Sequence, residues 1–340
     1  LGLGQNAGRK NMTEELSLEQ AAQRLKEQDR ILILCHKNPD GDTIGTGAAL
    51  CKALLALEKE AAVFCSDPIP AMYEYMRIQR YTGQWTPEYI VAVDVAGIQL
   101  FGDAAQQYQD RVDLCIDHHA TNSGYADATY LDAEAAAAAE IMVRLVDLLG
   151  VELTPELADC LYTGIATDTG CFRFSNTGAE THRTAARLMD AGARVSELNT
   201  LLFENRSRQR IVAEKIALQN LEYHFDGRCA LTFLTREEIT LSQVAPEELE
   251  NLTSLPRTIE GVDVGVTLRQ QPGGSYKVSI RTAGAADARV IAQHLGGGGH
   301  ARAAGCELMG NLDNTKAAVL AEVEREFRRQ EQLKQEEEQE

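Results

Sequence analysis

Six side chains of types that commonly bind divalent cations lie in two short stretches of this chain, residues 36–42 and 117–119, and at the separate positions Asp94 and Asp168. They are His36, Asp40, Asp42, Asp94, His118 and Asp168. A mixture of imidazole and carboxylate ligands suits manganese better than magnesium, which prefers oxygen atoms and water. Because six such ligands are enough to hold two divalent cations side by side, the sequence predicts hydrolytic phosphate chemistry.

The first stretch, residues 36–42, reads His-Lys-Asn-Pro-Asp-Gly-Asp and follows a strand predicted at residues 31–34. Its proline and glycine indicate a turn that gathers the side chains of His36, Asp40 and Asp42 round one point. On its own, Asn-Pro-Asp-Gly would indicate only a surface turn. The flanking His36 and Asp42 favour a metal site instead.

The second stretch, Asp117-His118-His119, ends an apolar strand, where buried charge is costly unless it is paired or metal-bound. One imidazole can bind a metal, and Asp117 can orient that ring from behind. Two histidines that merely cap a strand are the alternative. Asp94 also suits a helix cap, and Asp168 a turn, so both become metal ligands only in the company of the other motifs.

The elements that position these residues follow an α/β pattern. Strands are predicted at residues 31–34, 61–65, 89–93 and 113–116, and helical patterns separate them, which indicates parallel βαβ units. Ligands of such sheets gather beyond the carboxyl ends of the strands, where His36, Asp94 and Asp117 stand. Asp168 follows a helical pattern at 156–166, so this rule does not place it.

A second, smaller α/β domain is predicted after a boundary at residues 204–222, since 340 residues exceed the usual size of one core. Alternating apolar residues over 262–280 predict a β-hairpin with one buried face. A glycine-rich loop at 296–300 and a helix at 313–327 complete this domain. The predicted fold is a larger N-terminal domain with a mainly parallel sheet flanked by helices, a smaller C-terminal α/β domain, and a cleft between them.

The glycine-rich loop and the hairpin also carry candidate binding residues. At Gly298 and Gly299 no side chain prevents backbone N–H groups from approaching a phosphate or a base, and His300 follows directly. Arg281, at the end of the hairpin, can form paired hydrogen bonds with a terminal phosphate. A flexible linker and an exposed strand-end arginine are the alternatives.

The composition restricts the classes of partner. A formal net charge of -18 argues against broad electrostatic binding to duplex DNA, although metals and a few cationic residues can still hold a nucleotide. The eight cysteines include no Cys-x-x-Cys pair, which indicates reduced residues of a cytoplasmic protein. No apolar stretch approaches the roughly 18 residues that span a bilayer, so no membrane partner is expected.

Two terminal segments are left out of the fold prediction. Residues 1–11 are rich in glycine and polar residues and precede Met12, and we expect them to be an extension or a start-site artefact. Residues 331–340 form an acidic tail, which we expect to be a solvated, fraying helix end without a chemical role.

Taken together, the motifs resemble those of the DHH phosphoesterase family with its companion DHHA1 domain. The matching positions are residues 36–45, Asp94, residues 117–119, Asp168 and residues 297–305. The resemblance covers almost the whole chain and implies four segments. These are a metal-binding catalytic DHH domain at 12–203, a linker or hinge helix at 204–222, a substrate-binding DHHA1 domain at 223–330 and the acidic tail at 331–340.

The resemblance also implies roles for individual residues, with two Mn²⁺ ions as cofactors and Mg²⁺ or Co²⁺ as alternatives. One ion would take His36, Asp40 and Asp94, and the other would take Asp42, Asp94, His118 and Asp168. Asp94 would bridge both ions and His119 would contact the scissile phosphate, so both would be catalytic. Asp117 would support the ligands from behind. The nucleotide would be held by Arg281, Gly298, Gly299 and His300.

Two positions depart from the family pattern. Thr46 stands where the first motif usually has serine, a change that should keep a hydroxyl contact. Residues 95–97 read Val-Ala-Gly and lack the second acid that is common after Asp94. This absence affects secondary contacts but leaves the bridging ligand in place.

As function, the resemblance implies a manganese-dependent hydrolase of phosphoester bonds that works by two-metal activation of water. The expected substrates are short oligoribonucleotides, including linear dinucleotides such as pApA, and 3'-phosphoadenosine 5'-phosphate. Cyclic-di-AMP is the alternative substrate, and a nucleotide sensor without catalysis is the alternative from another class. The glycine-rich segment disfavours a pyrophosphatase, and the chain length disfavours a longer single-strand exonuclease. The polarity of attack and the formation of a homodimer stay open.

Overall fold

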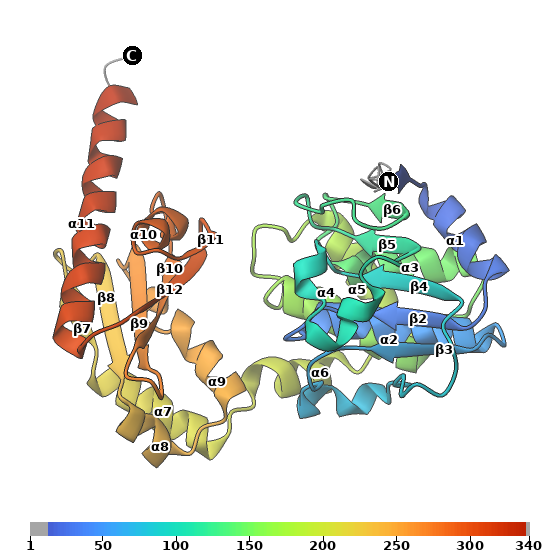
Figure 1. Ribbon diagram of the computed structural model, residues 1–340, viewed down its shortest axis with the longest axis horizontal. Coiled ribbons are helices and arrows are strands. Elements are labelled where there is room, and N and C mark those ends of the chain that lie inside the picture. Colours follow the sequence, from blue (N-terminus) through green and yellow to red (C-terminus); the bar gives the residue numbers. More distant parts are fainter. Residues whose placement is uncertain (1–12, 338–340) are drawn as a thin grey trace, which may run out of the picture. The chain divides into compact units, whose positions relative to one another are not determined.

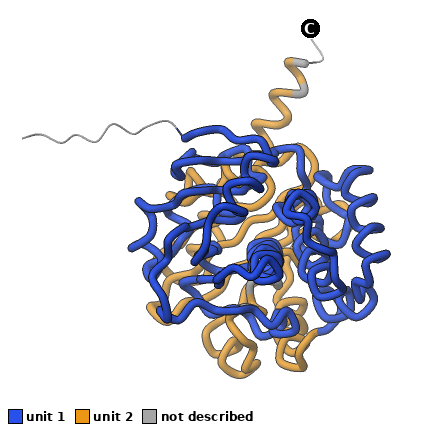
Figure 2. The backbone as a smooth tube through the Cα atoms, turned by 90° about the vertical axis from the view of Figure 1, so that its right-hand side faces the viewer, with its two compact units in different colours: residues 1–205 blue, residues 206–340 orange. Residues whose placement is uncertain are grey.

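The structure is a computed structural model that describes residues 13–337. The chain forms two compact units, residues 1–205 (unit 1) and 206–340 (unit 2), coloured separately in Figure 2. The division falls inside the segment 204–222 that the sequence predicts as the linker. Residues 1–11, expected to be an extension, and residues 338–340 of the acidic tail lie outside the described residues.

Unit 1 contains a six-stranded sheet in which every pairing is parallel, with strand order β1-β6-β5-β4-β2-β3 (Figure 1). Its strands are β1 (Glu14–Glu15), β2 (Ile31–Leu34), β3 (Ala61–Phe64), β4 (Tyr89–Val93), β5 (Leu114–Asp117) and β6 (Ala128–Leu131). The predicted parallel sheet is confirmed, and the four predicted strands are present to within one residue. The central strands are continuous apolar runs because both faces of the sheet are covered.

Helices cover one face of this sheet and short 3₁₀ turns cover the other. The helices of unit 1 are α1 (Leu18–Glu27), α2 (Gly41–Ala56), α3 (Ala138–Leu149), α4 (Pro155–Asp168), α5 (Ala179–Asp190) and α6 (Val195–Asn199). Residues of α1 to α4 pack with Ile33 and Val91 in one core cluster. On the opposite face, Leu32 packs with residues in and around η2 (Ile98–Leu100) and η3 (Asp103–Tyr108).

Helix α2 begins at Gly41, inside the segment 36–42 where the sequence predicts a turn. Asp40 is its N-cap, and the Asp40 Oδ1 atom accepts hydrogen bonds from the backbone N–H groups of Asp42 at 3.0 Å and Thr43 at 3.1 Å. The expected turn is therefore the first turn of a helix. The partial positive charge of a helix N-terminus favours carboxylates at such positions.

Glycines allow helices α2 and α4 to approach each other closely. A Cβ atom at Gly45 would lie 2.4 Å from the carbonyl oxygen of Cys160, and one at Gly164 would lie 2.6 Å from Asp42 Oδ1. Any side chain at these positions would push the helices apart. Helix α4 continues to Asp168, beyond its predicted end at residue 166, and its last residue reaches the carboxyl edge of the sheet.

Unit 2 contains a second six-stranded sheet with strand order β11-β12-β10-β9-β8-β7 (Figure 1). Its strands are β7 (Glu222–His224), β8 (Cys229–Leu234), β9 (Val264–Gln270), β10 (Tyr276–Thr282), β11 (Gly298–His300) and β12 (Ala303–Leu308). All pairings are antiparallel except that of β8 with β9. The predicted hairpin corresponds to β9 and β10 and is confirmed.

The expectation of a single buried face on this hairpin is wrong for β9, which is buried along six of its seven residues. Val266 and Leu268 belong to a core with helices α10 (Ala288–His294) and α11 (Leu312–Glu337). On the other face, Thr267 Oγ1 donates to the carbonyl oxygen of Thr253 at 3.5 Å. Small and polar residues pack there against chain segments, so alternation in the sequence did not mean exposure to water.

One further expectation for unit 2 is wrong. The glycine-rich segment forms strand β11 instead of a loop, because residues 298–300 pair with residues 303–305 of β12. Helix α11 extends through residue 337, so the described part of the acidic tail is helical, and its described side chains are exposed, as expected of a solvated helix end. Glu331 of this segment also forms an ion pair with Arg228, with 3.7 Å between the charged atoms.

The remaining helices of unit 2 are α7 (Arg208–Gln219), α8 (Arg236–Ser242) and α9 (Pro246–Asn251). Residues of α7 and α9 share a small apolar cluster with Leu234 and Val244. Over residues 13–337, no helix combines the length and the apolar character needed to cross a membrane.

Candidate metal centre

The six predicted ligands meet in unit 1 at the carboxyl edge of the parallel sheet. His36, Asp94 and His118 follow strands β2, β4 and β5, Asp40 and Asp42 come from the start of α2, and Asp168 comes from the end of α4. Their ligand atoms form two groups in which all atoms lie within 4.8 Å of one another. The groups are His36 with Asp40 and Asp94, and Asp42 with His118 and Asp168. A third group joins Asp94, His118 and His119.

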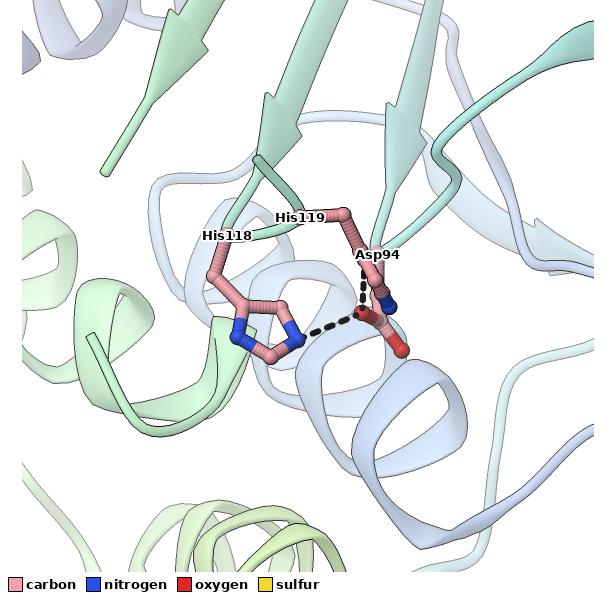
Figure 3. A group of neighbouring side chains, drawn as sticks. All are labelled: Asp94, His118 and His119. Carbon is pink, nitrogen blue, oxygen red and sulfur yellow. Dashed lines mark ion pairs between the residues drawn. The ribbon is translucent and has the colours of Figure 1, made fainter. Parts of the chain in front are cut away.

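Asp94 lies between the two groups, and its two oxygen atoms face different histidines. Its Oδ2 atom lies 3.7 Å from His36 Nε2, and its Oδ1 atom lies 3.4 Å from His118 Nε2 and 3.5 Å from His119 Nδ1. Figure 3 shows the Asp94 carboxylate pointing toward both rings of the histidine pair. This carboxylate therefore turns one oxygen atom toward each of the two ligand groups.

Backbone carbonyl groups determine which nitrogen of each ligand histidine faces the centre. His36 Nδ1 lies 2.8 Å from the carbonyl oxygen of Lys37, and His118 Nδ1 lies 3.2 Å from that of Ala135. Each carbonyl accepts a hydrogen bond from an Nδ1–H group, so Nε2 is the nitrogen that faces the carboxylates and can bind a cation once it is deprotonated.

Two buried atoms at the centre lack a hydrogen-bond partner within the described residues, namely Asp94 Oδ1 and His118 Nε2. When both are deprotonated they carry lone pairs, and at 3.4 Å they repel each other unless a proton or a metal cation lies between them. Such a pair of unpartnered acceptors in a set of imidazoles and carboxylates fits a divalent cation of the manganese or zinc class.

Asp94 occupies an unusual backbone conformation for a residue other than glycine. Its φ angle is 58°, and its backbone N–H donates to the carbonyl oxygen of Ile116 at 3.0 Å. Aspartate tolerates this left-handed region better than most residues, and strained backbone is concentrated at functional sites. Burial and the nearby carboxylates of Asp42 and Asp40 raise the pKa of Asp94 well above its usual value, and a bound cation would counteract this shift.

Asp42 is fully buried and is held by the N-terminus of helix α3. Its Oδ2 atom accepts from the Ala138 N–H at 2.6 Å, and its Oδ1 atom accepts from the Ala139 N–H at 2.9 Å and from Thr46 Oγ1 at 3.2 Å. This support could not be predicted from the sequence, because the alanines at 138 and 139 act through their backbone N–H groups alone. A helix N-terminus stabilises a buried carboxylate.

Asp117 supports His119 and not the ring of His118. Its Oδ1 atom accepts a hydrogen bond from His119 Nδ1 at 2.8 Å, and its Oδ2 atom accepts from Asn122 Nδ2 at 2.6 Å. The hydrogen bonds from His119 and Asn122 outweigh burial and lower the pKa of Asp117. Sequence reasoning missed Asn122, although it follows the Asp-His-His motif by only three residues. The His119 side chain is 43% exposed, so it is accessible to a substrate.

The candidate substrate-binding residues belong to unit 2. Arg281, Gly298 and Gly299 line a shallow hollow of about 640 Å³ beside Lys277, Ser279 and Glu307. His300 is exposed and is not among the described residues that line this hollow. The nucleotide-binding role of all four residues stays a prediction.

Two family descriptions match the chain. Residues 30–165 match the DHH family, N-terminal domain, and residues 237–329 match the DHHA1 domain. The bifunctional oligoribonuclease and PAP phosphatase NrnA of Thermus thermophilus is 37% identical over 313 residues, which cover 88% of this chain and 90% of that protein. The protein of the same name from Bacillus subtilis is 26% identical. The match covers 82% of this chain and 90% of that protein.

A cyclic-di-AMP phosphodiesterase, GdpP of Geobacillus thermodenitrificans, is also similar. It is 24% identical over 85% of this chain, but the match covers 45% of the relative.

Solved structures share the fold. An exopolyphosphatase-related protein from Bacteroides fragilis has a TM-score of 0.83 at 23% identity, covering 91% of this chain and 96% of that chain. RecJ from Thermus thermophilus in complex with Mn²⁺ has a TM-score of 0.55 at 16% identity. The match covers 91% of this chain and 55% of the RecJ chain. The two domain matches and the relative at 37% identity agree with the motifs on the sheet edge. The chain belongs to the DHH phosphoesterase family, carries a DHHA1 domain and is a phosphoester-hydrolysing enzyme.

Proposed function

We propose that this enzyme uses two Mn²⁺ ions to hydrolyse short oligoribonucleotides and 3'-phosphoadenosine 5'-phosphate in the cytoplasm. The observation that carries the proposal is the pair of buried, unpartnered acceptors Asp94 Oδ1 and His118 Nε2 within a set of six ligands. The names of the relatives from Thermus thermophilus and Bacillus subtilis, oligoribonuclease and PAP phosphatase, support the choice of substrates.

When bound, two divalent cations supply a water of lowered pKa and neutralise charge on the phosphoryl oxygens. Asp94 offers one oxygen to each ligand group, so it sets their separation. In its imidazolium form His119 donates Nδ1–H to Asp117 and can donate Nε2–H to a phosphoryl oxygen. The leaving oxygen takes its proton from solvent.

In unit 2, the hollow beside β10 and β11 suits the remaining part of the nucleotide. Arg281 and Lys277 bring positive charge to a chain with a net charge of -18. Gly298 and Gly299 present backbone without side chains, so a base or phosphate can approach closely. In this proposal unit 1 performs the chemistry, and Arg281, Gly298, Gly299 and His300 hold the substrate.

Cyclic-di-AMP is a second candidate substrate, because a cyclic-di-AMP phosphodiesterase matches over 85% of this chain. That relative is 24% identical to this chain, whereas the NrnA relative from Thermus thermophilus is 37% identical. The difference favours short oligoribonucleotides as substrates.

A panel of substrates tests the proposal. Purified protein with Mn²⁺ is assayed against di- to pentaribonucleotides, pApA, 3'-phosphoadenosine 5'-phosphate and cyclic-di-AMP, and kcat/KM is measured for each. We expect the highest values for the short oligoribonucleotides and for 3'-phosphoadenosine 5'-phosphate, and loss of activity when the metal is chelated. A highest value for cyclic-di-AMP would favour the second candidate. Nucleotide binding without any turnover would favour a sensor.

A further inference from the structure

The loop that follows the ligand Asp168 holds two phenylalanines in contrasting surroundings. Phe172 is partly buried, stacks on His182 with 5.2 Å between ring centroids and lies 6.0 Å from the ring of Tyr162. Phe174 is 54% exposed, and among the described residues no aromatic ring packs against it. Phe172 is therefore part of the core, whereas core packing does not explain Phe174.

The backbone of this loop is strained in a way that fixes the position of Phe174. Gly170, Cys171 and Phe172 are three consecutive residues with φ angles of 56°, 59° and 61°. For a cysteine and an aromatic residue this left-handed conformation costs on the order of 1 kcal/mol or more each, and such strain is concentrated at functional sites. The bend reverses the direction of the chain, and the Phe174 N–H donates to the carbonyl oxygen of Thr169 at 3.0 Å.

The tip of the Phe174 ring lies against Gly170, two residues after the ligand. A Cβ atom at Gly170 would lie 2.4 Å from the Cζ atom of this ring, so only glycine permits the contact. Asn176 anchors the loop, because its Nδ2 group donates to the carbonyl oxygens of Asp168 at 3.2 Å and Ala136 at 3.0 Å. The loop is thus anchored beside the ligand Asp168, and the Phe174 ring, whose tip lies against Gly170, keeps about half of its surface exposed.

A charged neighbour indicates what occupies this surface. Arg173 is exposed and donates through Nε to the carbonyl oxygen of Gly170 at 2.6 Å, which holds the guanidinium beside the same bend. A ligand with a flat apolar part and a negative charge matches an aromatic ring next to a cation. A nucleotide has both, and bases stack on exposed aromatic rings with little preference for sequence.

We infer that Phe174 is a nucleobase platform in unit 1, on which a base adjacent to the scissile phosphate stacks. The inference rests on the proposed function and extends it, since it adds to the catalytic unit a contact that recognises nucleotides. Phe174 would act on substrate affinity and not on the chemical step. Small phosphoesters without a base would gain nothing from it.

Three variants test the platform. Phe174→Leu removes the ring and keeps apolar bulk, Phe174→Trp provides a larger ring, and Tyr223→Leu removes another exposed aromatic residue, 56% exposed and located in unit 2, as a matched control. The substrates are pApA and two analogues, each with an abasic ribose at one of the two positions. Thermal unfolding of each metal-free variant verifies its folding.

For pApA we expect Phe174→Leu to raise KM by about tenfold with kcat within about twofold of the parent value. Phe174→Trp keeps an aromatic ring, so its KM should stay near the parent value. Tyr223→Leu should also have the KM of the parent. With one of the abasic analogues, the parent enzyme should bind as weakly as Phe174→Leu. Equal losses on all three substrates, a loss confined to kcat, or an unchanged KM would each overturn the platform.

A binding measurement separates the platform from the proposed function. Calorimetric titration with a non-hydrolysable phosphorothioate analogue of pApA measures affinity without turnover. If the parent protein binds it about tenfold more tightly than Phe174→Leu does but cleaves no substrate, the platform stands and the proposed function fails. If the parent cleaves pApA and both proteins bind the analogue equally, the proposed function stands and the platform fails.

Discussion

The metal centre of unit 1 and the hollow of unit 2 present their functional groups in opposite ways. Asp42 and Asp94 are buried, and backbone groups or neighbouring side chains fix the ligands around them. Gly298 and Gly299 lie instead on an exposed edge strand. Buried charges are costly and demand a fixed environment, whereas exposed groups keep their hydration until a ligand arrives. Substitutions in unit 1 should therefore act on metal binding and kcat, and those in unit 2 on KM.

The substitution Asp94→Asn should have the largest effect. An amide cannot offer an anionic oxygen to both ligand groups, so we expect kcat to fall by about 10³-fold or more, equivalent to about 4 kcal/mol. Calorimetric titration should show fewer than two Mn²⁺ ions bound per chain. Metal-free Asp94→Asn should be at least as stable as the parent protein in thermal unfolding, because the variant no longer buries this carboxylate.

The matched control for this variant is Asp147→Asn, which removes a carboxylate from an ion pair with Arg187 that is about half exposed. Exposed ion pairs contribute little to stability, so activity and metal content should stay at the parent level. Near-parent turnover of Asp94→Asn in Mn²⁺ would rule out the two-metal assignment.

The substitution Arg281→Ala should raise KM for pApA by about 10- to 100-fold, since a charge-assisted hydrogen bond contributes roughly 1.5–3 kcal/mol. Metal affinity should not change, because Arg281 belongs to unit 2. Steady-state kinetics and calorimetric Mn²⁺ titration measure the two quantities. Arg289→Ala, which removes an exposed arginine of α10 that pairs with Asp287, is the control. A loss of bound Mn²⁺ in Arg281→Ala would remove the proposed distinction between the two units.

The sequence predicted which candidate ligands lie close together better than it predicted the groups that support them. His36, Asp94 and His118 follow strands, and parallel strands share one edge, so their meeting could be expected. Asp168 reaches the same place because glycines allow close contact between α2 and α4, which is a tertiary effect that a local pattern does not reveal. The alanines that hold Asp42 act only through backbone N–H groups, which every sequence has.

In unit 2, local patterns were more misleading. The segment Gly298–His300 looks like a flexible loop, yet pairing with β12 makes it a strand. Glycine is weakly disposed to strands, so its conformation depends on the partner strand and not on its own preference.

The affinity of unit 1 for Mn²⁺ should rise with pH. In the metal-free protein, burial and the nearby Asp42 raise the pKa of Asp168 to about 7. Burial alone would lower the pKa of His36, but hydrogen bonding with Asp40 outweighs it and raises the value to about 9. Both groups therefore hold protons that a cation must displace, so affinity should fall as the pH drops through these values.

Each displaced proton should change the affinity by about tenfold per pH unit. Calorimetric titration between about pH 6 and 8.5, in buffers of different ionisation enthalpy, measures both the affinity and the protons released. Asp168→Asn should show a shallower dependence on pH below 7, because it removes one of these protons. An affinity that is constant across this range would contradict the proton competition.

The smallest effect is expected at Thr46, the position where the family usually has serine. Its Oγ1 atom donates to Asp42 Oδ1 at 3.2 Å, and a serine hydroxyl can make the same bond, so Thr46→Ser should keep kcat within about twofold. Thr46→Val removes the donor but retains the shape of the side chain. Asp42 then keeps the N–H groups of Ala138 and Ala139, so we expect Mn²⁺ affinity to fall only by several-fold. Calorimetric titration measures the affinity and steady-state assays measure kcat. A loss for Thr46→Val as large as that for Asp94→Asn would mean that the hydroxyl, and not the α3 backbone, holds Asp42 in place.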